Sequence, residues 1–171
     1  MVSAVPLVSA VPLESAVRAA LADVSDPEIP GLSIVDLGIV RNVQVGPGRV
    51  RVELLPTFIG CPAAELIREA VIERLAPFAA TVEAEITFAE PWTTERITPQ
   101  GRRQLRERGF APPTDMPLGR ELPLFTTVIA AECPWCGSSN TRLENAFGPT
   151  LCRAIAHCED CLQPFEQFKT V

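Results

Sequence analysis

The sequence predicts an α+β fold: a small mixed sheet with helices on one face, followed by a small four-cysteine ribbon. Three observations lead to this prediction. Apolar residues recur at helical spacing in 13–24 and 62–76. Strand patterns occupy 39–45, 49–55 and 81–88, where apolar and polar residues alternate as in half-buried strands. Two Cys-x-x-Cys pairs then follow near the C-terminus.

The composition suits one ordinary domain with a small appendage. The chain has 171 residues, of which 47% are hydrophobic and 21% charged, enough for a sizeable core. We expect a poorly ordered leader over 1–13, where VSAVPL occurs twice, and an α+β domain over 14–110. A proline-rich linker over 111–125 and a ribbon over 126–171 complete the expected organisation.

Charge and hydropathy exclude several classes of protein. A net charge of −6 argues against nucleic-acid binding, which depends on clustered Lys and Arg. No apolar run reaches the roughly 18 residues that a membrane helix needs. The N-terminus lacks the basic region of a signal peptide, so we expect a cytoplasmic protein, where cysteines serve as metal ligands or reactive thiols rather than disulfides.

A third helix is expected just after residue 98. Thr98 is a typical N-cap, Pro99 suits the first helical position and Gly109 suits the C-terminal end. This segment is rich in arginine, which indicates either a docking face for an acidic partner or a solvated amphipathic helix. The arginines are Arg96, Arg102, Arg103, Arg106 and Arg108.

The two Cys-x-x-Cys pairs predict a metal site. Cys133 and Cys136 form the first knuckle, and Cys158 and Cys161 form the second. Two knuckles that face each other close a tetrahedral set of four thiolates, which suits a structural Zn²⁺. The first knuckle also resembles that of a rubredoxin, so iron and electron transfer remain an alternative.

Two further residues lie near this motif in sequence. Cys152 precedes the second knuckle by six residues and is either a fifth sulfur beside the site or a buried thiol on a strand. His157 is the only histidine of the chain and adjoins Cys158. We treat both as candidates for a supporting position around the metal. A Cys–His hydrolase would need His157 to reach Cys61 from the other domain, which makes that class improbable.

Cys61 is isolated in sequence and is the candidate reactive residue. Because 39–45 and 49–55 are expected to form a hairpin, the loops before and after it meet at one end. The polar residues brought together there are Asp26, Glu28, Asp36 and Thr57. We expect Cys61 to be the N-cap of the following helix, where the helix dipole favours a thiolate. The alternative is that Cys61 is a small buried residue and that the carboxylates cap turns.

Three stretches together resemble a known family. "DPEIPGLSIVDLGIV", the pattern from Thr57 to Pro62, and "EPWTTERITPQGRRQLRERGF" resemble the α+β domain of SufT-type and MIP18-type iron–sulfur assembly factors. The C-terminal "CPWCGSSNTRLENAFGPTLCRAIAHCEDCLQPFEQFK" resembles the PaaD (PaaJ) family, subunits of the phenylacetyl-CoA epoxidase system. The resemblance covers about residues 14–171.

The resemblance implies an accessory subunit for phenylacetate degradation, not the catalytic one. It would help mature the iron–sulfur or di-iron centres of the oxygenase or reductase, with Cys61 holding iron or a cluster transiently. Its partners would be the other epoxidase subunits or the reductase, and a homodimer is left open. The alternatives are a purely structural docking subunit, an iron-binding electron carrier or, disfavoured by charge, a nucleic-acid binder.

Overall fold

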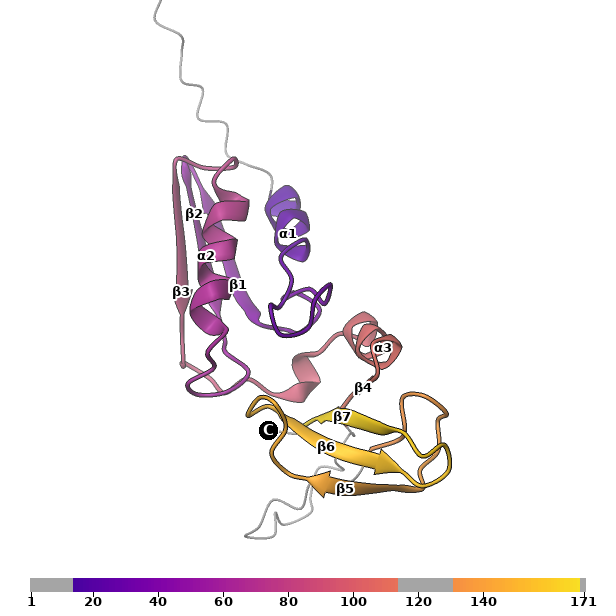
Figure 1. Cartoon of the computed structure of the whole chain (residues 1–171). Helices are drawn as coiled ribbons and strands as arrows, with labels where there is room; N and C mark the ends of the chain where they lie inside the picture. The colour runs from indigo at the N-terminus through magenta and orange to yellow at the C-terminus, as the bar shows by residue number, and fades with distance from the viewer. Residues whose placement is uncertain (1–13, 114–130, 170–171) are drawn as a thin grey trace, which may run out of the picture.

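The computed structural model describes residues 14–113 and 131–169 (Figure 1). The predicted leader, most of the predicted linker and residues 126–130 of the predicted ribbon lie outside these ranges. No helix in the described ranges is both long and apolar enough to span a membrane. The elements are α1 (Glu14–Ala22), β1 (Val40–Gly46), β2 (Arg49–Leu54), α2 (Ala64–Leu75), β3 (Thr81–Ile86), the 3₁₀ helix η1 (Thr94–Arg96), α3 (Pro99–Glu107), β4 (Phe110–Ala111), β5 (Thr141–Asn145), β6 (Arg153–Cys158) and β7 (Pro164–Phe168).

The first sheet has the order β1-β2-β3 and is mixed, as the sequence predicts. β1 and β2 form the expected antiparallel hairpin, whereas β3 lies parallel to β2. A parallel neighbour requires a crossover, and α2 supplies it. Helices α1 and α2 lie on the same face of the sheet (Figure 1). Exposed ion pairs join β2 to β3, with Arg49 to Glu83 and Arg51 to Glu85 both at 2.6 Å.

Helix α3 confirms the capping prediction. The Thr98 hydroxyl accepts a hydrogen bond from Gly101 N–H at 2.9 Å, and Pro99 occupies the first helical position. Gly109 follows the last turn at φ +79°, a conformation that favours glycine. The helix therefore ends where its local residues specify.

Several arginines in and around α3 stabilise neighbouring loops by donating hydrogen bonds to backbone carbonyls. Arg108 donates to the carbonyls of Pro30 and Gly31 at 3.1 and 3.0 Å. Arg102 donates to the carbonyl of Pro113 at 2.9 Å. These contacts give part of the local positive charge a structural role within the chain, and Arg103 and Arg106 are not needed for it.

The second sheet belongs to the ribbon but begins in the first domain. Its order is β4-β7-β6-β5, and β4 follows directly from α3. Phe110 and Ala111 pair with Glu166 and Gln167 of β7 in parallel register. Ala111, the first residue of the predicted linker, is thus a fully buried strand residue. The ribbon and the α+β domain share this strand pairing and are not merely tethered.

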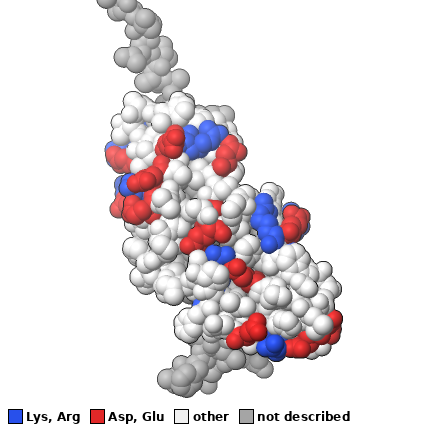
Figure 2. Space-filling view, in the orientation of Figure 1, with Lys and Arg blue, Asp and Glu red and all other residues white. Residues whose placement is uncertain are grey.

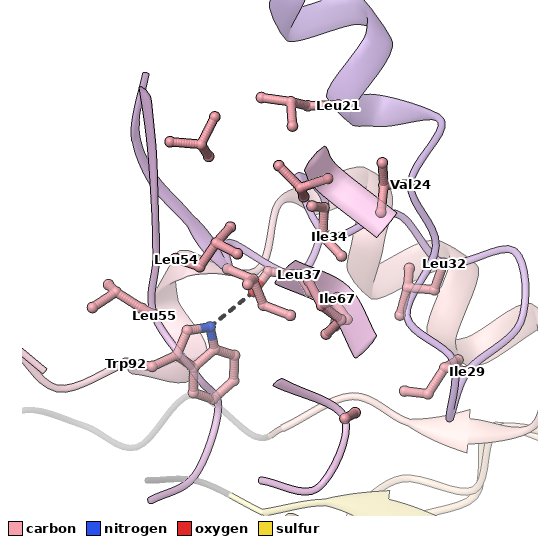
Figure 3. Close-up of a cluster of buried hydrophobic side chains, with 14 of the residues drawn as sticks. Leu21, Val24, Ile29, Leu32, Ile34, Leu37, Leu54, Leu55, Ile67 and Trp92 are labelled. Atoms are coloured by element: carbon pink, nitrogen blue, oxygen red, sulfur yellow. Dashed lines mark hydrogen bonds between the residues drawn. The ribbon is translucent and has the colours of Figure 1, made fainter. Parts of the chain in front are cut away.

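One apolar core joins the two parts of the molecule. Figure 3 labels residues of this core from the first domain, among them Trp92. Trp92 donates its indole N–H to the Leu37 carbonyl at 3.0 Å, which anchors the segment after β3 to the loop before β1. The Trp92 ring lies 5.8 Å from the ring of Phe168, a β7 residue that is only 1% exposed. Cys152 also belongs to this core cluster. The ribbon therefore contributes side chains to the core of the first domain.

Phe168→Ala tests this shared core. Removal of a fully buried phenylalanine is expected to lower the free energy of unfolding by about 3 kcal/mol or more, because it leaves a cavity beside Trp92. We expect the α+β domain and the ribbon then to unfold in separate transitions. Denaturant unfolding followed by tryptophan fluorescence and far-ultraviolet circular dichroism measures both effects.

Phe147→Ala is the matched control, since Phe147 lies in the same ribbon but is 71% exposed. Its ring contacts the Lys169 ammonium in a cation–π pair at 5.2 Å, so the expected loss is at most about 1 kcal/mol. Equal effects of the two substitutions would contradict a shared core.

Candidate metal centre and thiol site

The four knuckle cysteines converge on one point. Their sulfur atoms all lie within 4.8 Å of one another. The Cys133 and Cys161 sulfurs are 3.6 Å apart, as are those of Cys136 and Cys158. A tetrahedron with metal–sulfur bonds of about 2.3 Å has edges of about 3.8 Å, so the set fits four-thiolate coordination. A disulfide would bring two sulfurs to about 2 Å, and the six cysteines are free.

The two knuckles have matching backbones. Gly137 N–H donates to the Cys133 carbonyl at 2.9 Å, and Leu162 N–H donates to the Cys158 carbonyl at 3.0 Å. The residue after each second cysteine has positive φ, +75° at Gly137 and +59° at Leu162. The first knuckle uses a glycine for this turn, whereas the second holds an exposed leucine in a conformation that costs roughly 1–2 kcal/mol.

The protonation of these thiols explains why a cation is needed. The backbone N–H groups of Cys161 and Asp160 lower the pKa of Cys158 to about 7. Burial, and then the neighbouring thiols, raise the pKa of Cys161 to about 12. Four thiolates this close are stabilised together only when a bound cation supplies the opposing charge.

Cys152 and His157 do not join this set. The four-cysteine group contains neither of them. Cys152 is separated from Cys158 by extended residues of β6, a distance of about 20 Å along the strand. It therefore lies at the opposite end of β6, against the α+β domain. His157 lies on β6 opposite Arg142 and Pro164 and is half-buried.

The loop 24–34 positions two of the predicted acidic residues. Its ends are joined by the Ile34 N–H to Val24 carbonyl bond at 2.9 Å and by the Ser25–Ser33 bridge. Asp26 is buried, and its Oδ1 accepts hydrogen bonds from the N–H groups of Glu28 and Ile29 at 2.7 and 3.1 Å. The Asp26 carboxylate thus holds the turn that carries Glu28.

Burial governs the protonation of both carboxylates. Desolvation raises the pKa of Asp26, although its two backbone hydrogen bonds and Arg153 oppose this. The pKa of Glu28 is also raised, by burial and then by the Asp26 charge. Removal of these charges from water costs free energy, and a bound cation would return part of it.

Cys61 lies beside this loop, in a pocket shared with Asp26 and Thr57. Thr57 is buried, while Cys61 is half-buried at the pocket wall. The pocket residues are Asp26, Ile39, Leu54, Pro56, Thr57, Cys61, Ala64, Ile67 and Ile86. The structure therefore brings Cys61, Thr57 and Asp26 together, as the hairpin topology predicts.

The prediction that Cys61 caps helix α2 is wrong. The helix begins at Ala64 with Ala63 as its N-cap. Cys61 instead closes a turn, in which its N–H donates to the Phe58 carbonyl at 3.1 Å. Burial raises the pKa of the Cys61 thiol, and the nearby charges of Glu28 and Asp26 add to that effect, although a hydrogen bond from the Ala63 N–H opposes it. Burial therefore disfavours the thiolate that the sequence predicts.

Asp36 lies outside the pocket that contains Cys61. Its Oδ1 accepts the Thr98 hydroxyl hydrogen bond at 2.6 Å, and its carbonyl accepts from Thr98 N–H at 2.9 Å. Asp36 positions the start of α3 in this structure.

Two residues of the ribbon, Thr150 and Arg153, face Glu28. The sequence analysis did not predict either of them. Arg153 is buried, with its guanidinium 3.9 Å from the Glu28 carboxylate and 2.8 Å from that of Glu166. Its Nε donates to the Thr150 hydroxyl at 2.8 Å. Acidic and basic side chains adjoin between the two parts of the molecule on the face shown in Figure 2. A buried arginine has no local sequence signature, because its partners are distant in the chain.

Comparisons with known proteins match each of the two parts of the chain. A PaaD zinc beta ribbon domain matches residues 123–169, and an iron-sulfur cluster assembly protein domain matches residues 14–88. A protein of Escherichia coli (strain K12), provisionally named as a 1,2-phenylacetyl-CoA epoxidase component, is 40% identical over 155 residues, or 90% of each chain. The chain belongs to the PaaD family.

Other relatives match only the first domain of this PaaD-family chain. The Bacillus subtilis Fe-S protein maturation auxiliary factor YitW is 34% identical over 85 residues, covering 48% of this chain and 82% of YitW. The crystal structure of a domain of unknown function, DUF59, from Bacillus anthracis is 31% identical with a TM-score of 0.50, covering 54% of this chain and 90% of that one. The chain therefore joins an iron–sulfur assembly domain to a ribbon.

Cys136→Ser tests the metal centre. Loss of one of four ligands is expected to remove the bound metal and unfold the ribbon, because a segment this small depends on the ion for its stability. Metal analysis of the purified protein and proteolysis of the ribbon measure these effects.

Cys152→Ser is the matched control, since Cys152 lies outside the four-cysteine group. It should keep the ribbon metal. Loss of that metal in the control, or its retention in Cys136→Ser, would contradict the assigned ligand set.

The pH dependence of Cys61 alkylation tests its protonation state. A raised pKa lowers the thiolate fraction at neutral pH, so the rate with iodoacetamide should be slow at pH 7 and still rising beyond about pH 9. Mass spectrometry of the Cys61 peptide in metal-loaded protein measures this rate. A plateau below about pH 8 would instead indicate the thiolate expected from the sequence.

Proposed function

We propose that this PaaD-family chain is an accessory subunit of the phenylacetyl-CoA epoxidase system and assists maturation of a partner's iron–sulfur or di-iron centre. It is not proposed to catalyse the epoxidation itself. The observation that carries the proposal is Cys61 in one pocket with buried Asp26 and Thr57, within an assembly-type domain. The epoxidase system in this proposal is taken from the name of the E. coli relative.

The chemistry of the pocket suits transient binding of iron or a cluster as cargo. Thiol sulfur and carboxylate oxygen are both iron ligands, and one thiol alone holds a cation weakly. Because the Cys61 pKa is raised, binding of a cation must release the thiol proton. Ile59 and Leu66 are exposed near Cys61 in sequence, and these apolar side chains could contact a client protein.

The ribbon centre is proposed to hold zinc in a structural role. Four thiolates complete a tetrahedral shell and leave no open position for substrate or water. The cysteines that would hold the ion are Cys133, Cys136, Cys158 and Cys161. The ribbon would then provide a folded surface for the other epoxidase subunits or the reductase. We place this assembly in the cytoplasm, the reducing compartment that free cysteines favour.

A docking subunit with an inert Cys61 is the second candidate. Two features favour it: burial raises the pKa of the Cys61 thiol, and the Asp26 carboxylate already accepts the hydrogen bonds of its own turn. In that case the ribbon alone would carry the function. The two candidates differ in whether the sulfur of Cys61 is needed.

Cys61→Ser in cells grown on phenylacetate decides between them. If Cys61 delivers cargo, growth on phenylacetate is lost and the cluster content of the reductase falls to a minor fraction of wild type, because serine is a poor iron ligand. Growth on acetate should be unaffected. Growth curves and iron and sulfide analysis of the purified reductase measure the effects.

Glu73→Gln, an exposed change on α2, is the control and should behave as wild type. The variant proteins must retain ribbon metal, which shows that they fold. Normal growth and normal cluster content with Cys61→Ser would remove the delivery role and leave the docking function.

A further inference from the structure

The ribbon brings a second free thiol to the side of the Cys61 site. Cys152 lies directly before β6 and is 8% exposed. It belongs to the same core cluster against which Cys61 packs. Cys152 is not required by the four-cysteine centre, which is complete without it. Its position in the fold therefore needs a separate explanation.

Polar contacts connect Cys152 to the acidic loop. The Cys152 sulfur lies 3.2 Å from the Thr150 hydroxyl, which accepts a hydrogen bond from Arg153 Nε at 2.8 Å. The Arg153 guanidinium in turn lies 3.9 Å from the Glu28 carboxylate. The Glu28 N–H donates to Asp26, which lines the pocket of Cys61. Two thiols and two carboxylates thus meet at the junction, from three separate chain segments.

The junction is rich in groups that become anionic and has a positive charge supplied by the ribbon. Arg153 pairs with Glu28 and Glu166 and lies 5.4 Å from the Phe110 ring centroid. Asp26 lines the pocket of Cys61, and Cys61 packs against the core cluster that contains Cys152. An added cation would be stabilised by the carboxylate charges.

We infer that Cys152 is a second thiol donor of the Cys61 site, so that the two domains together take a thiophilic divalent cation such as ferrous iron. Asp26 and Glu28 provide oxygen donors beside the two sulfurs. On binding, both thiol protons leave to solvent and two sulfur–metal bonds form. This inference rests on the proposed function, since it names the ligands and cargo class of that site.

The donor atoms of the junction lie farther apart than those of the ribbon centre. Among groups of three or more His, Cys, Asp or Glu within the described residues, only the four ribbon cysteines have ligand atoms all within 4.8 Å of one another. A cation at the junction must therefore pull Cys61 and Cys152 toward it, at a cost in packing. Such a site binds weakly and releases readily, as a cargo site requires, whereas the converged ribbon site holds its ion permanently.

Cobalt titration of the zinc-loaded, full-length protein tests the inference. Zn²⁺ binds thiolates more tightly than Co²⁺, so the ribbon stays filled with zinc. Added Co²⁺ should give a thiolate-to-metal charge-transfer band at the junction. In Cys152→Ala the band at saturation is expected to fall to about half and the affinity by about tenfold or more, because one of two sulfurs is lost. Cys61→Ser should do the same, and the double variant should give no band.

Leu151→Ala, an exposed change in the same segment, is the control and should leave the band unchanged. A purely structural role for Cys152 would weaken binding without reducing the band at saturation. If Cys152→Ala does not retain ribbon zinc, Cys152→Ser preserves the side-chain size and gives the same test.

Three outcomes separate this inference from the proposed function. A halved band in each single variant supports the inference. A band that depends on Cys61 but not on Cys152 overturns it and leaves the proposed function intact. The absence of a cobalt band in the wild type also overturns the inference. The proposed function is then tested separately, by growth of the Cys61→Ser strain on phenylacetate.

Discussion

Four thiols within 4.8 Å of one another can lose their protons together only around a cation, and the rest of the structure depends on that constraint. A bound ion would close the two knuckles and so fix the start of strand β7 and the end of strand β6, which adjoin them. Strand β7 places Phe168 in the core beside Trp92. Strand β6 places Arg153 beside the loop that carries Glu28. A metal at one end of β6 would thereby support the position of Cys152 at the other end.

The junction combines structural and chemical roles in the same side chains. Asp26 supports its turn through two backbone hydrogen bonds, while its buried charge lies in the pocket of Cys61. A buried arginine without partners would be strongly destabilising, so Arg153 requires both Glu28 and Glu166. The ribbon is thus positioned by the same carboxylates that can attract a cation.

Local rules predicted much of the fold because they act over short distances. The Cys-x-x-Cys spacing was sufficient for the ribbon ligands, and Thr98 with Pro99 was sufficient for the start of α3. The same kind of rule failed at Cys61, where Pro62 is compatible both with a helix start and with a turn. The Cys61 N–H bond to Phe58 selects the turn, and burial then raises the pKa that a helix N-terminus would have lowered.

By itself, the sequence determined the mixed sheet, the capped helix and the four thiol ligands, because periodicity, caps and short spacings act between near neighbours in the chain. Only the tertiary structure decided where Asp36 and Cys152 lie and that Arg153 is buried. The extended residues of β6 move Cys152 about 20 Å from the knuckle that it precedes. Contacts between distant segments, and the burial that shifts a pKa, exist only once the whole chain is packed.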